Sequence, residues 1–122
     1  MHTTDITSRE EIEELMQPGG AAALIDFWAA WCGPCRAMAP HFEKAAELMA
    51  DEPVEFLKVD TEKHSQIASA FNVRSLPTIV VVHDGEIQDV MIGAQDTLTL
   101  KRAAQRVIDD AEGKGFIKKL FG

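Results

Sequence analysis

The stretch "AAALIDFWAAWCGPCRAMAP", residues 21–40, contains the only two cysteines of the chain, Cys32 and Cys35. Its first eight residues are almost entirely apolar, as is typical of a buried β-strand, and Asp26 is the one exception. A helical pattern of apolar residues begins after the second cysteine. We therefore expect a strand that leads into a helix, with both cysteines at the junction.

The spacing of the cysteines suits a reversible bridge. Residues three apart on a helix lie on one face, with β-carbons ~5–6 Å apart, and a small adjustment brings such a pair into disulfide geometry. Pro34 fits a first helical turn, because the N–H that it lacks would be unpaired there. Gly33 allows a tight turn and leaves the first sulfur uncovered.

The two thiols are not equivalent. Cys32 is expected at the helix N-terminus, where free N–H groups and the helix dipole favour the thiolate, which is the nucleophile. Cys35 lies further into the helix and is more sheltered. We predict that Cys32 attacks a target disulfide and that Cys35 then resolves the mixed disulfide.

Three other interpretations of the pair are weaker. A haem attachment site would have a histidine after the second cysteine, where this chain has Arg36. A permanent disulfide would close a very small loop and constrain little. A zinc site needs about four ligands, and beyond the cysteines the chain offers only scattered histidines: His2, His41, His64 and His83.

The rest of the chain alternates helices and strands. The expected elements are a helix capped by Thr7 or Ser8 and ended by 17–20, a strand over 21–28, a helix over 34–50, a strand over 54–60, a short helix over 63–71, a strand over 78–83, a "DG" turn, a return strand over 86–93 and a helix from Leu100 to Glu112. A strand–helix–strand unit gives parallel strands and a hairpin gives antiparallel ones. This order predicts a mixed sheet with helices on both faces.

Composition and charge exclude some functions. With 122 residues, the chain suits one domain, and its net charge of −8 argues against unaided nucleic-acid binding. No apolar run approaches the ~18–20 residues of a membrane span, and the first 16 residues do not resemble a signal peptide. We therefore expect a cytoplasmic protein, where structural disulfides are rare and a lone cysteine pair is better explained by chemistry.

Residues 113–122 form a basic and apolar C-terminal extension of the domain over 1–112. The extension contains three lysines and no acid. Its apolar residues would form one stripe on a helix, with Lys118 and Lys119 on the other side: Phe116, Ile117, Leu120 and Phe121. The segment is too short for a stable isolated helix. We expect it to pack against the protein's own surface or a neighbouring copy; the alternatives are that it is disordered or that it binds a partner or an anionic surface.

Several motifs together resemble the thioredoxin family. They are "DFWAAWCGPC" followed by Pro40, "KVDTE" at 58–62, "SLPT" at 75–78 and "IGA" at 92–94. The resemblance covers about residues 5–112. It implies the α/β thioredoxin fold, a central mixed β-sheet flanked by four helices, with a first strand near residues 2–6 that the sequence pattern does not indicate.

The same resemblance implies roles for individual residues. Cys32 is the nucleophile and Cys35 the resolving thiol. Asp26 matches a buried carboxylate that assists deprotonation of Cys35 through water, Lys58 lies near that carboxylate, and Pro77 matches a cis-proline loop that faces the dithiol. The residues that match a substrate-binding surface are Trp31, Gly33, Pro34, Leu76, Ile92, Gly93 and Ala94.

Without the resemblance, these residues are less informative. Asp26 is either a costly buried charge or a satisfied polar group at a sheet edge. Lys58 is a solvated strand residue, and Trp28 belongs to the core. Pro77 should precede a strand, because proline has no N–H for the interior of a sheet.

We expect a thiol–disulfide oxidoreductase that reduces protein disulfides. It needs no cofactor, because the Cys32–Cys35 pair carries the electrons. The implied partners are disulfide-containing proteins and a thioredoxin reductase-type electron donor, and we expect a monomer. Two alternatives are an extracytoplasmic disulfide oxidase or isomerase, and a non-enzymatic binding or chaperone subunit built on the same fold.

Overall fold

The computed structural model describes residues 2–114 and contains one five-stranded sheet. Its strands lie in the order β1-β3-β2-β4-β5, so β2 is central. Strands β1, β3 and β2 run parallel, and β4 and β5 run antiparallel to their neighbours. The bounds are Thr4–Asp5 for β1, Ala23–Trp28 for β2, Glu55–Asp60 for β3, Thr78–His83 for β4 and Glu86–Ile92 for β5. The predicted mixed sheet is confirmed.

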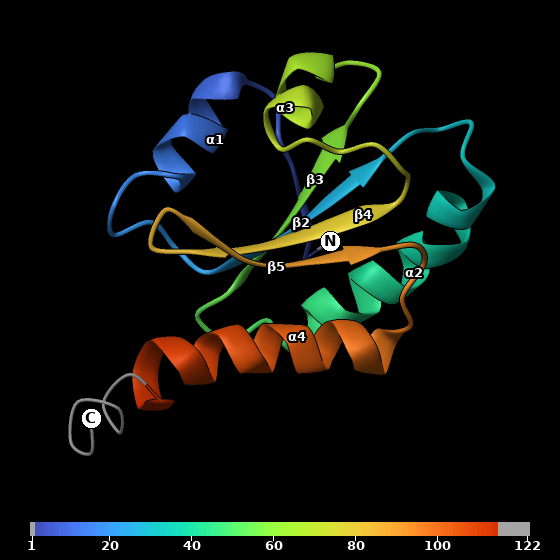
Figure 1. Ribbon diagram of the computed structural model, residues 1–122. Coiled ribbons are helices and arrows are strands. Elements are labelled where there is room, and N and C mark those ends of the chain that lie inside the picture. The colour runs from blue at the N-terminus through green and yellow to red at the C-terminus, as the bar shows by residue number, and fades with distance from the viewer. Residues whose placement is uncertain (1, 115–122) are drawn as a thin grey trace.

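Four helices cover the two faces of this sheet. Helices α1 and α3 lie on one face, and α2 and α4 on the other (Figure 1). Their bounds are Arg9–Leu15 for α1, Gly33–Leu48 for α2, Ser65–Ala70 for α3 and Thr97–Asp109 for α4, which a π-helical turn extends to Lys114. Helix α4 begins before its apolar stripe, because Asp96 caps it by accepting the Thr99 N–H. The apolar stripe expected over 116–121 lies outside the described residues.

Two apolar layers enclose the central strand. On the α2 and α4 side, Leu24 packs with Phe42 and Leu100, whereas on the α1 and α3 side Ile25 and Phe27 pack with their own cluster. Successive residues of a strand point to opposite faces, so a strand covered on both sides is apolar along its whole length. This explains why residues 21–28 show no alternation.

The hairpin between β4 and β5 follows from its two turn residues. Asp84 and Gly85 both have positive φ, 56° and 74°, as a type I′ turn requires. Gly85 has a second reason to be glycine, because an added Cβ would lie 2.7 Å from the Gln17 carbonyl oxygen. The predicted "DG" turn is confirmed, and it also packs the hairpin against the connection that leads into β2.

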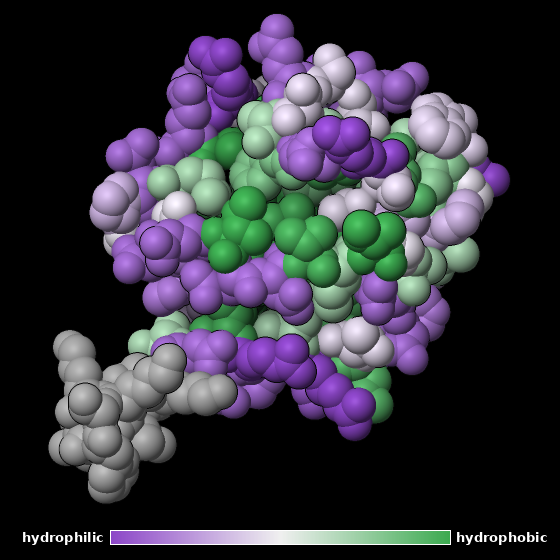
Figure 2. Space-filling view, in the orientation of Figure 1, coloured by the Kyte–Doolittle hydropathy of each residue, from purple (hydrophilic) through white to green (hydrophobic). Residues whose placement is uncertain are grey.

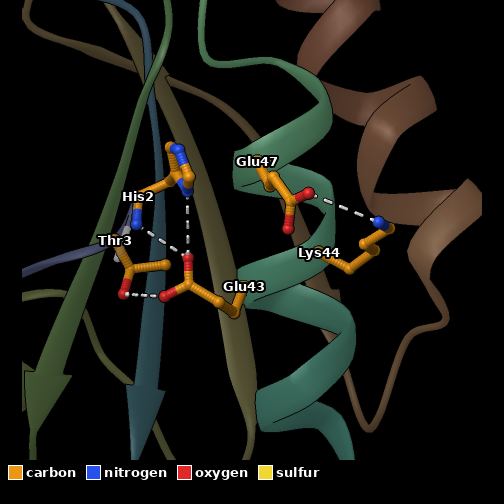
Figure 3. Close-up of polar contacts among 5 residues, drawn as sticks. All are labelled: His2, Thr3, Glu43, Lys44 and Glu47. Carbon is orange, nitrogen blue, oxygen red and sulfur yellow. Dashed lines mark hydrogen bonds and ion pairs between the residues drawn. The ribbon is translucent and has the colours of Figure 1, made fainter.

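A polar cluster ties α2 to the beginning of the chain (Figure 3). The Glu43 carboxylate accepts hydrogen bonds from the His2 backbone N–H at 2.8 Å and the Thr3 hydroxyl at 3.3 Å. The next residue of α2, Lys44, forms an ion pair of 3.4 Å with Glu47, and both side chains are about half exposed. The bonds to Glu43 hold the helix that carries Cys35 against the edge of the sheet next to β1.

The edge strand β5 presents an apolar face to solvent. Apolar side chains gather along β5 in Figure 2, and Ile87, Val90 and Ile92 are each about half exposed or more. Their register with β4 places them on the α1 and α3 side, but these helices lie over the other strands. The Val90 N–H donates to the Asp89 carboxylate at 2.8 Å, which occupies one backbone donor that another strand could use.

We predict that Phe42→Ala lowers the free energy of unfolding by about 3–5 kcal/mol, because Phe42 is fully buried in the apolar layer between the sheet and helices α2 and α4. The matched control is Leu48→Ala on the same helix, where Leu48 is 51% exposed and we expect a change within about 0.5 kcal/mol. Urea unfolding followed by circular dichroism measures both. Equal losses in the two variants would contradict the assignment of this layer as the core.

Candidate active site

Both cysteines lie where β2 passes into α2, as the sequence predicts. Cys32 is the N-cap of α2, with extended backbone angles, and Cys35 is in the first turn. The two α-carbons are 5.2 Å apart and the sulfurs form a disulfide. The Cys35 N–H donates to Cys32 Sγ at 3.2 Å. A free helix N–H is therefore directed at the first sulfur, which is the arrangement that stabilises a thiolate there.

The disulfide lies in an apolar cluster with little exposure. Cys32 and Cys35 are 4% and 3% exposed, and both pack with Ala29. Trp28 and Leu76 border the same cluster from β2 and from the loop before β4. Residues from three separate segments therefore meet at the sulfurs.

The helix start beside the sulfurs is open on one side. Gly33 and Pro34 are exposed, and among residues 2–114 no other segment approaches within 4 Å of the position that a side chain at Gly33 would occupy. The Arg36 guanidinium donates to the Ala30 carbonyl at 2.8 Å, which links the first turn of α2 to the preceding loop. The Arg36 bond therefore holds the backbone on both sides of Cys32 in place, and the exposed Gly33 lies next to the sulfurs.

Asp26 is in the middle of the central strand and is 1% exposed. Its Oδ1 has no hydrogen-bond partner among the described residues. Burial raises the pKa of Asp26 to about 7, and the positive charge of Lys58 opposes part of that rise. The alternative of a satisfied polar group at a sheet edge is therefore wrong, because β2 has a strand on either side.

Lys58 is linked to Asp26 and to Trp28. It is opposite Asp26 in the register of β3 with β2, so both side chains point to the α2 face. Its Nζ lies 5.0 Å from the centroid of the Trp28 ring, within the range of a cation–π contact. The interpretation of Lys58 as a merely solvated residue is therefore incomplete.

Trp28 is the site neighbour that our sequence reasoning missed. It was assigned to the core, yet it borders the cysteine cluster, lies beneath Lys58, and has a buried Nε1 without a hydrogen-bond partner among the described residues. A signal was available, because Trp28 is two residues after Asp26 and so shares its face of the strand.

The loop before β4 contacts the cysteine cluster through Leu76. The Leu76–Pro77 peptide bond is cis, and Pro77 immediately precedes β4, as expected from its missing N–H. The Thr78 hydroxyl donates to the Ser75 carbonyl at 2.6 Å, and the Gly93 N–H donates to the Pro77 carbonyl at 2.9 Å. The second bond joins the loop to the residue after β5.

The residues expected to form a substrate-binding surface differ in exposure, and two of them lie beside this loop: Ile92 is paired with Thr78, and Gly93 is bonded to Pro77. Trp31 and Ile92 are 66% and 67% exposed, and Ala94 is also exposed. Gly93 has φ of 94°, a conformation that side chains rarely tolerate, and this lets its N–H reach the Pro77 carbonyl. Leu76 is half-buried and connects the loop to the cysteine cluster.

Neither a metal centre nor a membrane span appears in the part of the chain that the structure describes. Within residues 2–114, histidine, cysteine and carboxylate side chains do not gather in groups of three that could hold a metal ion. None of the helices in this range has the length and apolar composition needed to cross a bilayer. The redox-active group of the site is the cysteine pair itself.

Comparisons with known proteins agree with this geometry. The thioredoxin family model matches residues 3–106. Thioredoxin of Mycoplasma genitalium is 43% identical over 90 residues, covering 74% of this chain and 85% of that protein. Thioredoxin 1 of Synechococcus elongatus is 39% identical over 97 residues, covering 80% of this chain and 86% of that protein.

Solved structures show the same likeness. The crystal structure of Malassezia sympodialis thioredoxin superposes with a TM-score of 0.76 at 36% identity, covering 85% of this chain and 89% of that one. Thioredoxin from Trypanosoma brucei brucei gives a TM-score of 0.77 at 30% identity, covering 88% and 91%. With its dithiol at the N-terminus of α2 and a five-stranded sheet flanked by four helices, the chain belongs to the thioredoxin family and is a protein-disulfide reductase.

Proposed function

We propose that the protein reduces disulfides of other proteins by ordered exchange, with Cys32 as the attacking thiol and Cys35 as the resolving thiol. The observation that carries this order is the hydrogen bond from the Cys35 N–H to Cys32 Sγ. That bond favours negative charge on Cys32, which is also the cysteine beside the open approach over Gly33.

The exchange conserves atoms and electrons. The Cys32 thiolate attacks one sulfur of the target disulfide, that bond breaks, and the released target thiolate takes up a proton. Cys35 then loses its proton and attacks Cys32 Sγ, which releases the second target thiol. Two electrons have moved to the target, and the protein is left as the Cys32–Cys35 disulfide.

Asp26 is proposed as the proton acceptor that assists Cys35. A carboxyl with a pKa of about 7 can hold or release a proton near neutral pH, as a general base must. Asp26 points to the face of the sheet that α2 covers. Lys58 is proposed as a positioning residue, because its charge lowers the pKa of Asp26 while its contact with Trp28 fixes where that charge lies.

An extended substrate segment is proposed to bind across the apolar surface around the dithiol. Trp31 and Ile92 offer the exposed apolar area, and Leu76 and Pro77 line the loop between them and the sulfurs. Gly33, Pro34, Gly93 and Ala94 complete this surface, and the absence of side chains at the two glycines lets a backbone approach closely. Support for this assignment comes from the exposure of Trp31, Ile92 and Ala94, whereas Pro77 is buried and Leu76 is half-buried beneath them.

The partners follow from the electron balance. After each turnover the disulfide must receive two electrons, and we propose that a thioredoxin reductase-type donor supplies them. A cytoplasmic location belongs to the same proposal, because a reducing compartment keeps such a cysteine pair in its reduced, dithiol form. We propose that the protein acts as a monomer and without a bound cofactor.

We predict that Cys35→Ser traps a mixed disulfide through Cys32 when the reduced protein meets a protein disulfide, because the resolving thiol is absent. Cys32→Ser should form no adduct and show no turnover. Mass spectrometry of peptides from the adduct identifies the bonded cysteine. An adduct at Cys35 in the Cys32→Ser variant, at a comparable rate, would reverse the proposed roles.

We predict that Asp26→Ala raises the free energy of unfolding by roughly 1–4 kcal/mol at neutral pH. The folded-state pKa of Asp26 lies above its unfolded value, so the wild-type protein loses stability as pH rises from about 4 and stops losing it above about 7. Most of that pH dependence should disappear in the variant, and resolution of the mixed disulfide should slow.

Urea unfolding between these pH limits and single-turnover exchange measure the two effects of Asp26→Ala. The control is Asp51→Ala, which removes an exposed carboxylate and should keep the pH dependence and the exchange rate. A less stable Asp26→Ala protein with an unchanged exchange rate would overturn both the burial argument and the proposed role.

A further inference from the structure

A groove of about 530 Å³ lies at the end of the sheet opposite the dithiol. It is bordered by the residues before β2, the start of β3, the end of β4 and the end of α4. Strand β2 runs from the groove side, at Ala22, to the loop that carries Cys32. The groove and the cysteine pair therefore lie at opposite ends of β2.

The groove combines an apolar floor with an acidic rim. Ala22, Val54 and Ile108 contribute apolar surface, and Val54 packs against the core cluster below. Exposed carboxylates line the rim: Glu52, Glu55 and Glu112. No lysine or arginine is among the described residues that line it. This surface suits a short segment that is both apolar and basic.

The chain itself contains such a segment, which follows in sequence the end of the last helix at the border of the groove. Residues 115–122 read "GFIKKLFG" and contain four large apolar residues and two lysines. The segment begins after Lys114, and Glu112, two residues earlier, already lines the groove. Eight residues span ~12 Å as a helix and up to ~26 Å when extended, which is enough to enter the groove.

We propose that residues 116–121 bind in this groove of their own chain. The stripe of Phe116, Ile117, Leu120 and Phe121 covers the apolar floor, while Lys118 and Lys119 face the carboxylates of the rim. Glycine at position 115, directly after the π-helical turn that ends at Lys114, allows the chain to change direction there. The groove is therefore an intramolecular binding site for a basic, apolar peptide.

Two features favour this occupant over an external one. Short tethers give effective concentrations on the order of millimolar, so weak complementarity is sufficient within one chain. The net charge of −8 and the acidic rim oppose approach to an anionic membrane, whereas they attract the extension's own lysines. A second copy could offer the same groove, but only at its solution concentration.

The direct test compares amide chemical shifts of the full chain and of a chain truncated after Lys114. We expect differences at Ala22, Val54 and Ile108 that do not depend on protein concentration, and a melting temperature lower by about 5 °C in the truncated chain. Rates of disulfide reduction should be unchanged. Unchanged shifts at these three residues would overturn the proposal.

Charge reversal tests the rim. Glu55→Lys should speed tryptic cleavage after Lys118 and Lys119 by about tenfold, because it releases the segment from the groove. Glu62→Lys, just past the other end of the same strand, is the control and should leave that rate unchanged. Combining Lys118→Glu and Lys119→Glu with Glu52→Lys and Glu55→Lys should restore the groove shifts seen in the wild type.

Two further outcomes would replace the proposal with another occupant. Groove shifts that grow with protein concentration, with a matching change in sedimentation, would assign the groove to the segment of a second copy. Co-sedimentation with vesicles of phosphatidylcholine and phosphatidylserine that requires Lys118 and Lys119, together with unchanged groove shifts, would assign the segment to a membrane surface.

Discussion

Burial of β2 on both faces is the constraint on which the rest of the structure depends. The strand is central, so its two apolar layers require helices on either side, and its hydrogen bonds require β3 and β4 as neighbours. Its end then leads into α2, and this junction fixes Cys32 at a helix N-cap. Fold and reactive group are therefore consequences of one short segment.

Local chemistry made much of this fold predictable. "DG" specified the turn at Asp84, the cysteine spacing specified the helix start, and Ser8 is one of the two expected N-caps, where it forms a capping box with Glu11. These signals act through neighbouring backbone atoms. The first strand could not be predicted, because two residues carry no periodicity and Thr4 and Asp5 are strand residues only through their pairing with β3.

The site was predictable only as far as its residues interact along the chain. The cysteines follow from local spacing, but the contact of Lys58 with Trp28 depends on the register of β3 with β2, which one sequence does not reveal. The meeting of Pro77 with Gly93 likewise depends on how the hairpin returns. The family resemblance supplied Lys58, Pro77 and Gly93, whereas patterns alone assign Trp28 to the core and Lys58 to solvent.

The exposed apolar face of β5 affects how the protein associates with other copies of itself at high concentration. Its apolar side chains can adhere to another surface, but the Asp89 carboxylate over the Val90 N–H interferes with the ladder by which sheets extend. Association of two molecules through β5 should therefore rely on side-chain contacts, and such complexes should form and dissociate rapidly. The Asp89 carboxylate therefore disfavours the ordered pairing of strands that leads to fibrils, although apolar contacts can still form on this face.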